Sequence, residues 1–82
     1  MNYLVLTEAQ LGTALKNRRK ELGFTQVETG LKVGLLPKTI SALETNPARS
    51  SIESLLKLIS ALNLEITLSP TPSQGKLAKD EW

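Results

Sequence analysis

At 82 residues the chain is long enough for one small domain, and it contains neither cysteine nor histidine. These absences exclude disulfides, thiolate metal sites and the usual general base, and no glycine-rich phosphate loop or informative carboxylate pair is present, so we expect no enzyme, no metal and no cofactor. The formal net charge of +2 divides into +3 over residues 1–49 and −1 over residues 50–82, which indicates nucleic-acid binding only if the bases share one face.

The sequence contains no run of about 18 apolar residues, the length that a membrane span requires. The first ten residues, MNYLVLTEAQ, lack the basic region and long apolar core of a signal peptide. We therefore expect a cytoplasmic protein with no membrane association.

Residues 3–6, YLVL, are apolar and β-prone, and they predict an edge strand or an arm packed on the body. Thr7 with Gln10 has the pattern of a capping box, so a first helix should begin there. This helix should end before Gly23, a residue type favoured just after helix ends. Its bases Lys16, Arg18 and Lys20 are predicted to form mainly a solvated face, with the alternative that one of them reaches a nucleic-acid backbone.

Two further short helices are predicted on either side of Gly34. Thr25 with Glu28 is a second capping box, and the helix that it starts should stop at the glycine. Pro37 then suits the first position of the next helix, where its missing N–H is not needed. Asn46 precedes a proline and should end that helix.

A fourth helix is predicted to begin at a capping box of Ser50 with Glu53. Its apolar pattern consists of Ile52, Leu55, Leu56, Ile59 and Leu62. Beyond it, residues 64–68 alternate with period two, and Leu64, Ile66 and Leu68 share one face of a predicted strand. A lone strand needs a partner, either residues 3–6 or the same strand of a second copy. We expect a folded domain over residues 1–69 and a disordered tail over 70–82.

A short helix, a tight glycine turn and another helix make a helix-turn-helix, in which the second helix enters the DNA major groove. That assignment explains why polar residues crowd the start of the helix at Pro37. Ile40 and Leu43 should point inward, which leaves the outer face for base and phosphate contacts. The candidates on that face are Pro37, Lys38, Thr39, Ser41 and Ala42.

The segment FTQVETGLKVGLLPKTISALE resembles the helix-turn-helix of the phage-repressor (lambda-repressor-like, Cro or XRE) family, and the resemblance covers residues 8–62. It implies an all-α domain of four to five short helices, a phosphate contact from Gln26, a phosphate or minor-groove contact from Arg49, and a structural ion pair between Arg19 and Glu44. The sequence departs from the family at residues 28–30, where Glu-Thr-Gly replaces the usual Glu-Leu-Ala. Because glycine has a low helix propensity, the second helix is expected to be less stable than is typical of the family.

The order of helices, the strand LEITL, the polar tail and the final Glu81-Trp82 resemble the HipB-type antitoxins. This resemblance implies a homodimer paired through the strand, binding to double-stranded operator DNA, and binding to HipA, a protein-kinase-like toxin. Trp82 would then be an anchor for that partner.

The hypothesis is therefore a dimeric, sequence-specific repressor of a palindromic operator that also acts as an antitoxin. One alternative is a stand-alone Cro-like regulator, which a kinase-like reading frame beside the gene would argue against. Another is a protein-interaction module that retains the fold without DNA binding, which an absence of salt-dependent DNA binding would favour.

Overall fold

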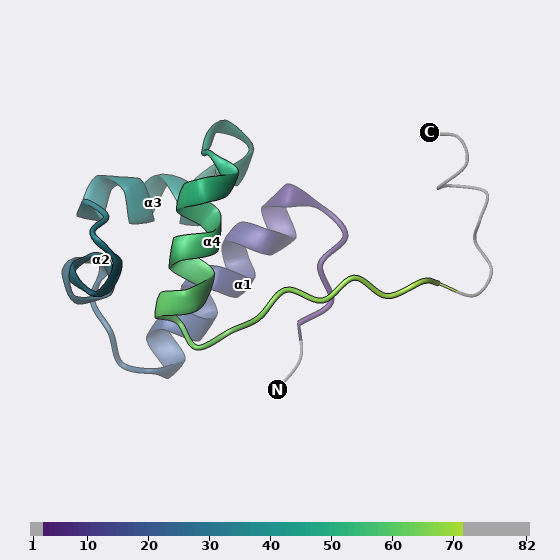
Figure 1. Cartoon of the computed structure of the whole chain (residues 1–82), viewed down its shortest axis with the longest axis horizontal. Helices are drawn as coiled ribbons and strands as arrows, with labels where there is room; N and C mark the ends of the chain where they lie inside the picture. The colour runs from purple at the N-terminus through teal and green to yellow at the C-terminus, as the bar shows by residue number, and fades with distance from the viewer. Residues whose placement is uncertain (1–2, 72–82) are drawn as a thin grey trace.

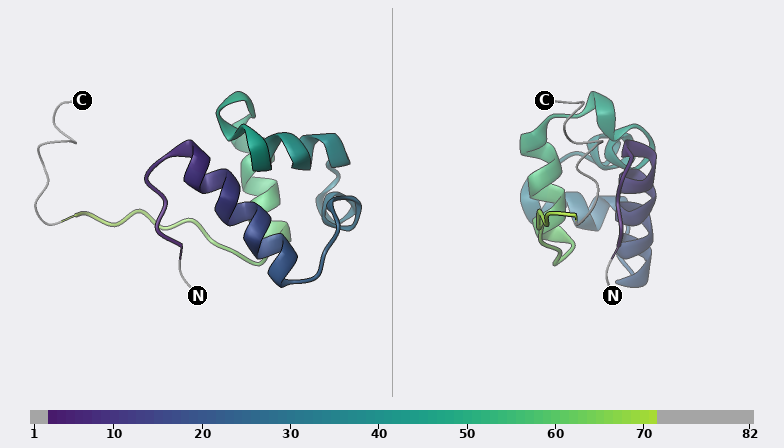
Figure 2. Two further views of the ribbon diagram at one scale, coloured as in Figure 1. Left: turned by 180° about the vertical axis from the view of Figure 1, so that it is seen from behind. Right: turned by 90° about the vertical axis from the view of Figure 1, so that its right-hand side faces the viewer.

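The computed structural model describes residues 3–71, which form four α-helices and one 3-10 helix between two extended segments (Figure 1). The helices are α1 (Glu8–Glu21), α2 (Gln26–Val33), α3 (Pro37–Thr45), η1 (Pro47–Arg49) and α4 (Ile52–Ala61). The helical architecture predicted from the sequence is confirmed. The α2–α3 pair lies at one end of the molecule, and both extended segments lie at the other (Figures 1 and 2). Between residues 3 and 71, no helix has the length and apolarity to cross a membrane.

Side-chain caps fix where α1 and α2 begin. Thr7 Oγ1 accepts from the Gln10 N–H at 3.1 Å, and Gln10 Oε1 accepts from the Thr7 N–H at 3.1 Å. Thr25 and Glu28 exchange the equivalent bonds at 3.0 and 2.8 Å. Both capping boxes predicted from the sequence are therefore present, and each satisfies backbone donors that the first helical turn leaves free.

The capping box predicted at Ser50 for the fourth helix is wrong by one residue. Ser51 is the N-cap of α4, and its Oγ accepts from the Ser54 N–H at 3.0 Å. Ser50 instead ends η1, where its N–H donates to the carbonyl of Pro47 at 3.0 Å. The unpredicted 3-10 turn extends the connection and moves the start of α4.

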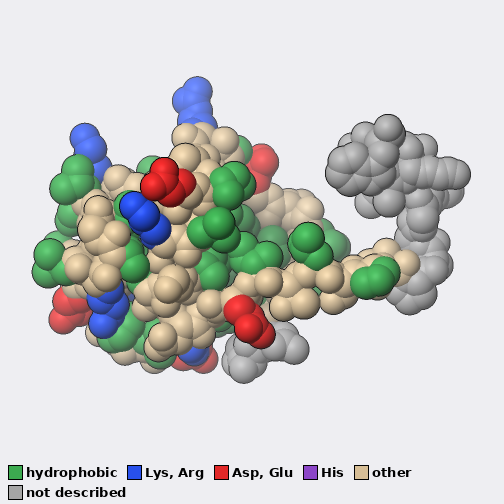
Figure 3. Space-filling view, in the orientation of Figure 1, with side chains coloured by type: hydrophobic (Ala, Val, Ile, Leu, Met, Phe, Trp, Pro, Cys, Tyr) green, Lys and Arg blue, Asp and Glu red, His purple; other side chains and the backbone are tan. Residues whose placement is uncertain are grey.

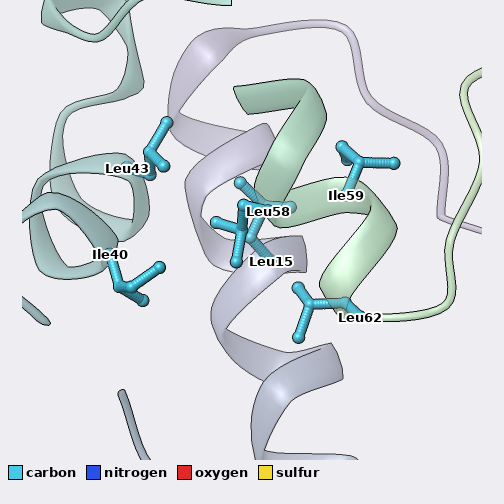
Figure 4. Close-up of a cluster of buried hydrophobic side chains, with 6 residues drawn as sticks. All are labelled: Leu15, Ile40, Leu43, Leu58, Ile59 and Leu62. Atoms are coloured by element: carbon cyan, nitrogen blue, oxygen red, sulfur yellow. The ribbon is translucent and has the colours of Figure 1, made fainter. Parts of the chain in front are cut away.

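One apolar cluster joins α1, α3 and α4 (Figure 4). Its buried members are Leu15, Ile40, Leu43, Leu58, Ile59 and Leu62. Leu58, which the sequence pattern missed, is fully buried, whereas Ile52 and Leu56 are 68% and 49% exposed. The face of α4 that packs in the core therefore differs from the face predicted from its apolar residues, because it includes Leu58 and excludes Ile52 and Leu56.

Two helical glycines mark places where backbones come close together. A Cβ on Gly12 would lie 2.5 Å from the carbonyl oxygen of Glu44, so α1 approaches the end of α3 closely there. A Cβ on Gly30 would overlap the carbonyl oxygen of Leu35 in the turn after α2. Gly30, considered from the sequence only for its low helix propensity, has a packing reason for its presence.

After α4 the chain turns through Asn63, whose φ of +57° is left-handed, and Leu64 N–H donates to the carbonyl of Ile59 at 3.0 Å. Residues 64–68 then run extended, but no strand is formed within residues 3–71. Of the two alternatives for residues 3–6, the edge strand paired with 64–68 in the same chain is not formed, since no ladder joins the two segments, and the arm remains. Pairing of 64–68 across a dimer stays a prediction.

The predicted boundary between domain and tail at residues 69–70 also stays a prediction. Trp82 and the other residues of 72–82 lie outside the described part of the chain.

Candidate nucleic-acid interface

The turn between α2 and α3 is built by Gly34, whose φ of +74° is the left-handed conformation that glycine adopts most readily. The N–H groups of Gly34 and Leu35 both donate to the carbonyl of Gly30, the second at 2.9 Å. Helix α3 starts one residue after Leu36, which makes no side-chain cap, with Pro37 in its first turn. The polar residues at the start of α3 are therefore not its N-cap.

The two faces of α3 are clearly separated. Ile40 and Leu43 are fully buried and point into the core (Figure 4). On the other side, three candidate contact residues are exposed and two are half-buried. The exposed ones are Pro37, Lys38 and Ala42, and the half-buried ones are Thr39 and Ser41. All five candidates therefore lie on one short, accessible helix at the end of the molecule.

Arg49 is exposed at the end of η1, in the connection between α3 and α4. Basic side chains on the face seen in Figure 3 project from the helical body, and none lies over the extended C-terminal segment. Three of the seven bases in the first 49 residues, Lys32, Lys38 and Arg49, lie on α2, α3 and η1 and are exposed, and the other four lie on α1.

Arg19 and Glu44 form a buried, bidentate ion pair. Arg19 Nε lies 2.6 Å from Glu44 Oε2, and Nη2 donates to Oε1 at 3.1 Å. The side chains are only 10% and 2% exposed. Arg19 Nη1 also donates to the carbonyl of Phe24 at 2.8 Å, so one guanidinium joins α1, the turn after it and α3.

The hydrogen bond to Glu44 raises the pKa of Arg19 above its usual value, and the charge of Glu44 adds to this effect while burial opposes it. Arg19 therefore stays charged, and its guanidinium is bonded to Glu44 and to the carbonyl of Phe24.

Gln26, the expected phosphate contact at the start of α2, has an internal partner that sequence reasoning missed. Its Nε2 donates to Glu44 Oε1 at 3.2 Å, and the residue is half-buried. A glutamine amide nitrogen carries two N–H donors, so one remains for an outside acceptor. Glu44 thereby orients the amide of Gln26 as well as pairing with Arg19.

Arg18 is not the solvated residue that the sequence predicted. Its Nε donates to the carbonyl of Leu62 at 3.0 Å, and its Nη1 pairs with Glu21 at 3.0 Å. Glu21 Oε1 also accepts from the hydroxyl of Tyr3 at 3.4 Å. Lys16 and Lys20 remain exposed, as expected for a solvated face. The contacts of Arg18 link residues 44 apart in sequence, which no local pattern reveals.

Comparison with known proteins agrees with this geometry. The helix-turn-helix family model matches residues 15–68. Antitoxin HipB of Escherichia coli O6:H1 is 32% identical over 95% of this chain and 87% of its own length. Antitoxin HipB of Escherichia coli K12 is 30% identical over 95% and 93%.

Two solved structures resemble this chain in both fold and sequence. A complex of a HipB variant with an O2 20mer has a TM-score of 0.81 and 31% identity, and the match covers 85% of this chain and 97% of that one. A HipA-HipB-O2-O3 complex has a TM-score of 0.79 and 34% identity, with 83% and 96% covered. The chain belongs to the helix-turn-helix family, and within it to the HipB antitoxins.

Proposed function

We propose that this protein is a sequence-specific DNA-binding repressor that acts as a homodimer on a palindromic operator, and that it binds and neutralises a HipA-like kinase toxin and represses its own operon. The observation that carries the DNA-binding role is the outward face of α3, which presents Lys38 while Ile40 and Leu43 fix the opposite face in the core. The similar structures contain HipB with an O2 20mer and HipB with HipA, which supports both partners.

The five candidate residues of α3 would make different contacts with DNA because their side chains differ in chemistry. The Lys38 ammonium can donate to guanine O6 and N7, and the hydroxyls of Thr39 and Ser41 suit a base or a phosphate. Pro37 and Ala42 offer only apolar contact, as to a thymine methyl. These five side chains would read the major groove.

Contacts with the sugar-phosphate backbone of the DNA would position α3 in the groove without reading the base sequence. The second side-chain amide N–H of Gln26, which Glu44 does not use, lies at the start of α2, where the helix dipole also favours a phosphate. Arg49 reaches outward from η1 and would contact a phosphate or the minor groove. Two copies would place their α3 helices about 34 Å apart, one turn of DNA. Pairing of Leu64, Ile66 and Leu68 between the two chains would set that spacing.

Replacing Lys38 with alanine is expected to weaken operator binding by about 1–3 kcal/mol, or roughly 5- to 150-fold, because a base-reading donor is lost. Binding to unrelated DNA should change little. A gel-shift titration with the upstream region of the gene measures both affinities. Lys57→Ala, which removes the same charge from α4, is the matched control and should bind operator nearly as wild type does.

Operator affinity unchanged in Lys38→Ala would remove Lys38 from the reading face. No salt-dependent DNA binding by the wild-type protein would instead favour a protein-interaction module.

Deleting Trp82, or the tail from Ser73 onward, is expected to weaken toxin binding and leave operator binding intact. Tryptophan buries a large area with few torsions to freeze, and it is enriched among residues that dominate binding energy. If residues 69–82 are disordered, as the sequence predicts, about fourteen residues would span roughly 20 Å, enough to reach a neighbouring protein. Calorimetry with the toxin compares the two truncations with the full chain, and equal affinities would leave Trp82 without a role.

A further inference from the structure

We infer that residues 3–6, here called the N-terminal arm, form one wall of a groove that receives residues 64–68 of a second copy of this chain. This inference rests on the proposed homodimer, and it adds a second segment to an interface assigned so far to Leu64, Ile66 and Leu68.

The groove has a volume of about 1070 Å³ and lies between the two extended segments. The N-terminal arm lines one side and residues 63–69 with Thr71 line the other. Its floor comes from α1 and α4, through Leu11, Ala14, Leu15, Leu55 and Ile59. The right-hand view of Figure 2 shows the two segments apart from each other. Figure 4 shows Ile59 on the side of α4 that faces them.

The walls of this groove carry large apolar side chains that the described residues 3–71 leave exposed. Leu4 is 81% exposed and Leu6 is 74% exposed on one wall, and Leu68 is 92% exposed on the other. Hydrophobic side chains extend from the helical body toward the C-terminal segment in Figure 3. Contiguous exposed apolar surface of this kind marks an interaction site.

The N-terminal arm is fixed in place at both ends. Tyr3 donates to Glu21, which pairs with Arg18, and Arg18 also donates to the carbonyl of Leu62 where the opposite wall begins. At the other end of the arm, Leu6 N–H donates to Gln10 Oε1 at 2.7 Å. Arg18 therefore links the arm, through Glu21, to the C-terminal end of α4 where the opposite wall begins.

The chemistry of the groove selects an extended, apolar segment. Glu65 is the one charged residue among those that line it, so it offers little to a charged ligand. Within residues 3–71, the backbones of residues 4–5 and 65–68 make no hydrogen bonds, and these groups can pair with an added strand.

Residues 64–68 of a second copy have the required properties. They are extended and apolar at alternate positions, and the backbones of residues 65–68 have no hydrogen-bond partners within the described chain. Each copy carries both the groove and the segment that fills it, so a two-fold dimer would satisfy both copies at once. The two extended segments that line the groove lie at the opposite end of the molecule from α3 (Figure 1), so a partner bound there would leave the proposed DNA-reading face free.

The first test is the dimer dissociation constant of the full chain, measured by analytical ultracentrifugation without DNA. The double variant Leu4→Asp/Leu6→Asp should weaken the dimer at least tenfold, because two carboxylates would face an apolar segment. Leu31→Asp is the matched control, since Leu31 is 79% exposed but lies on α2 outside the groove, and its dimer constant should stay within about twofold of wild type. Circular dichroism checks that each variant is folded.

A monomeric wild-type protein would overturn the proposed homodimer itself. A dimeric wild type with an unchanged constant in the folded double variant would overturn the role of the arm alone. Ile66→Pro removes a backbone donor from residues 64–68, so its dimer dissociation constant shows how much affinity is lost when the strand itself cannot pair.

A second test identifies what occupies the groove, and it uses the absence of cysteine from the natural chain. Chains with Leu4→Cys are mixed with differently tagged chains with Ile66→Cys and oxidised. A disulfide between the two chains supports the inference, and Leu31→Cys chains should give none with the same partner. Leu4→Cys chains that stay uncoupled while Ile66→Cys chains couple with each other would overturn it in favour of strand pairing without the arm.

Discussion

Replacing Arg19 with alanine is expected to lower the free energy of unfolding by about 3–5 kcal/mol, because the carboxylate of Glu44 would remain buried without its partner. Glu44 is 2% exposed in its side chain and makes its two arginine contacts at 2.6 and 3.1 Å, so water cannot readily replace the guanidinium. The loss would also free the carbonyl of Phe24. Urea unfolding followed by circular dichroism, at one protein concentration for all variants, measures the change.

Lys57→Ala provides the contrast for this experiment. Lys57 pairs with Glu53 at 3.6 Å, and the two side chains are 45% and 80% exposed. An exposed pair of this kind contributes less than about 0.5 kcal/mol. If Arg19→Ala unfolds as wild type does and loses DNA affinity instead, Arg19 is a contact residue and its structural role is wrong.

The pH dependence of the same pair follows from the raised pKa of Arg19. A group whose pKa is raised on folding contributes its full stabilisation below its unfolded-state pKa and loses it only as the pH rises through the folded-state value. For Arg19 both values lie far above neutrality, since the arginine pKa is high in the unfolded chain and the hydrogen bond to Glu44 raises it further. Arg19 should therefore cause no change in the urea midpoint between pH 6 and 9.

The second large effect is expected at Gly30. Replacement by alanine would favour an isolated helix by up to about 1 kcal/mol, but in the folded protein the new methyl would overlap the carbonyl oxygen of Leu35. Because that oxygen belongs to the backbone of the α2–α3 turn, the turn must shift, and the net cost should be about 3 kcal/mol. Urea unfolding gives the stability, and a gel shift should show weaker operator binding because α3 is displaced.

Leu31→Ala tests the same helix without the close contact. Leu31 is 79% exposed on α2, so its truncation should change stability by less than about 0.5 kcal/mol. A Gly30→Ala variant that is more stable than wild type would mean that helix propensity outweighs the contact with Leu35.

The helices were predictable because their signals are local. Thr7 and Thr25 each bond to a residue three positions later, and Gly34 takes the left-handed conformation that ends α2. A capping motif and an αL glycine occupy only a few residues of sequence. The start of α4 was missed by one residue because η1, a structure without a strong sequence signal, lies before it.

Contacts between distant residues could not be predicted from such patterns. Gln26 was assigned outward from its place at a helix start, yet it also bonds to Glu44, which lies 18 residues away. Arg18 appeared free because its acceptor at Leu62 is a backbone carbonyl, a group that every residue has. The ion pair of Arg19 with Glu44 was expected only through resemblance to a family. Side-chain partners of this kind are set by how helices pack, and periodicity does not specify that packing.

The division of α3 into two faces has a consequence for how this protein can change over evolution. The buried face is occupied by Ile40, Leu43 and Glu44, whereas Pro37 and Lys38 are exposed. Substitutions on the outward face can therefore accumulate without loss of folding. A duplicated copy could acquire a different operator in a few steps and stop competing with its parent for the same promoter, while both copies keep the same scaffold.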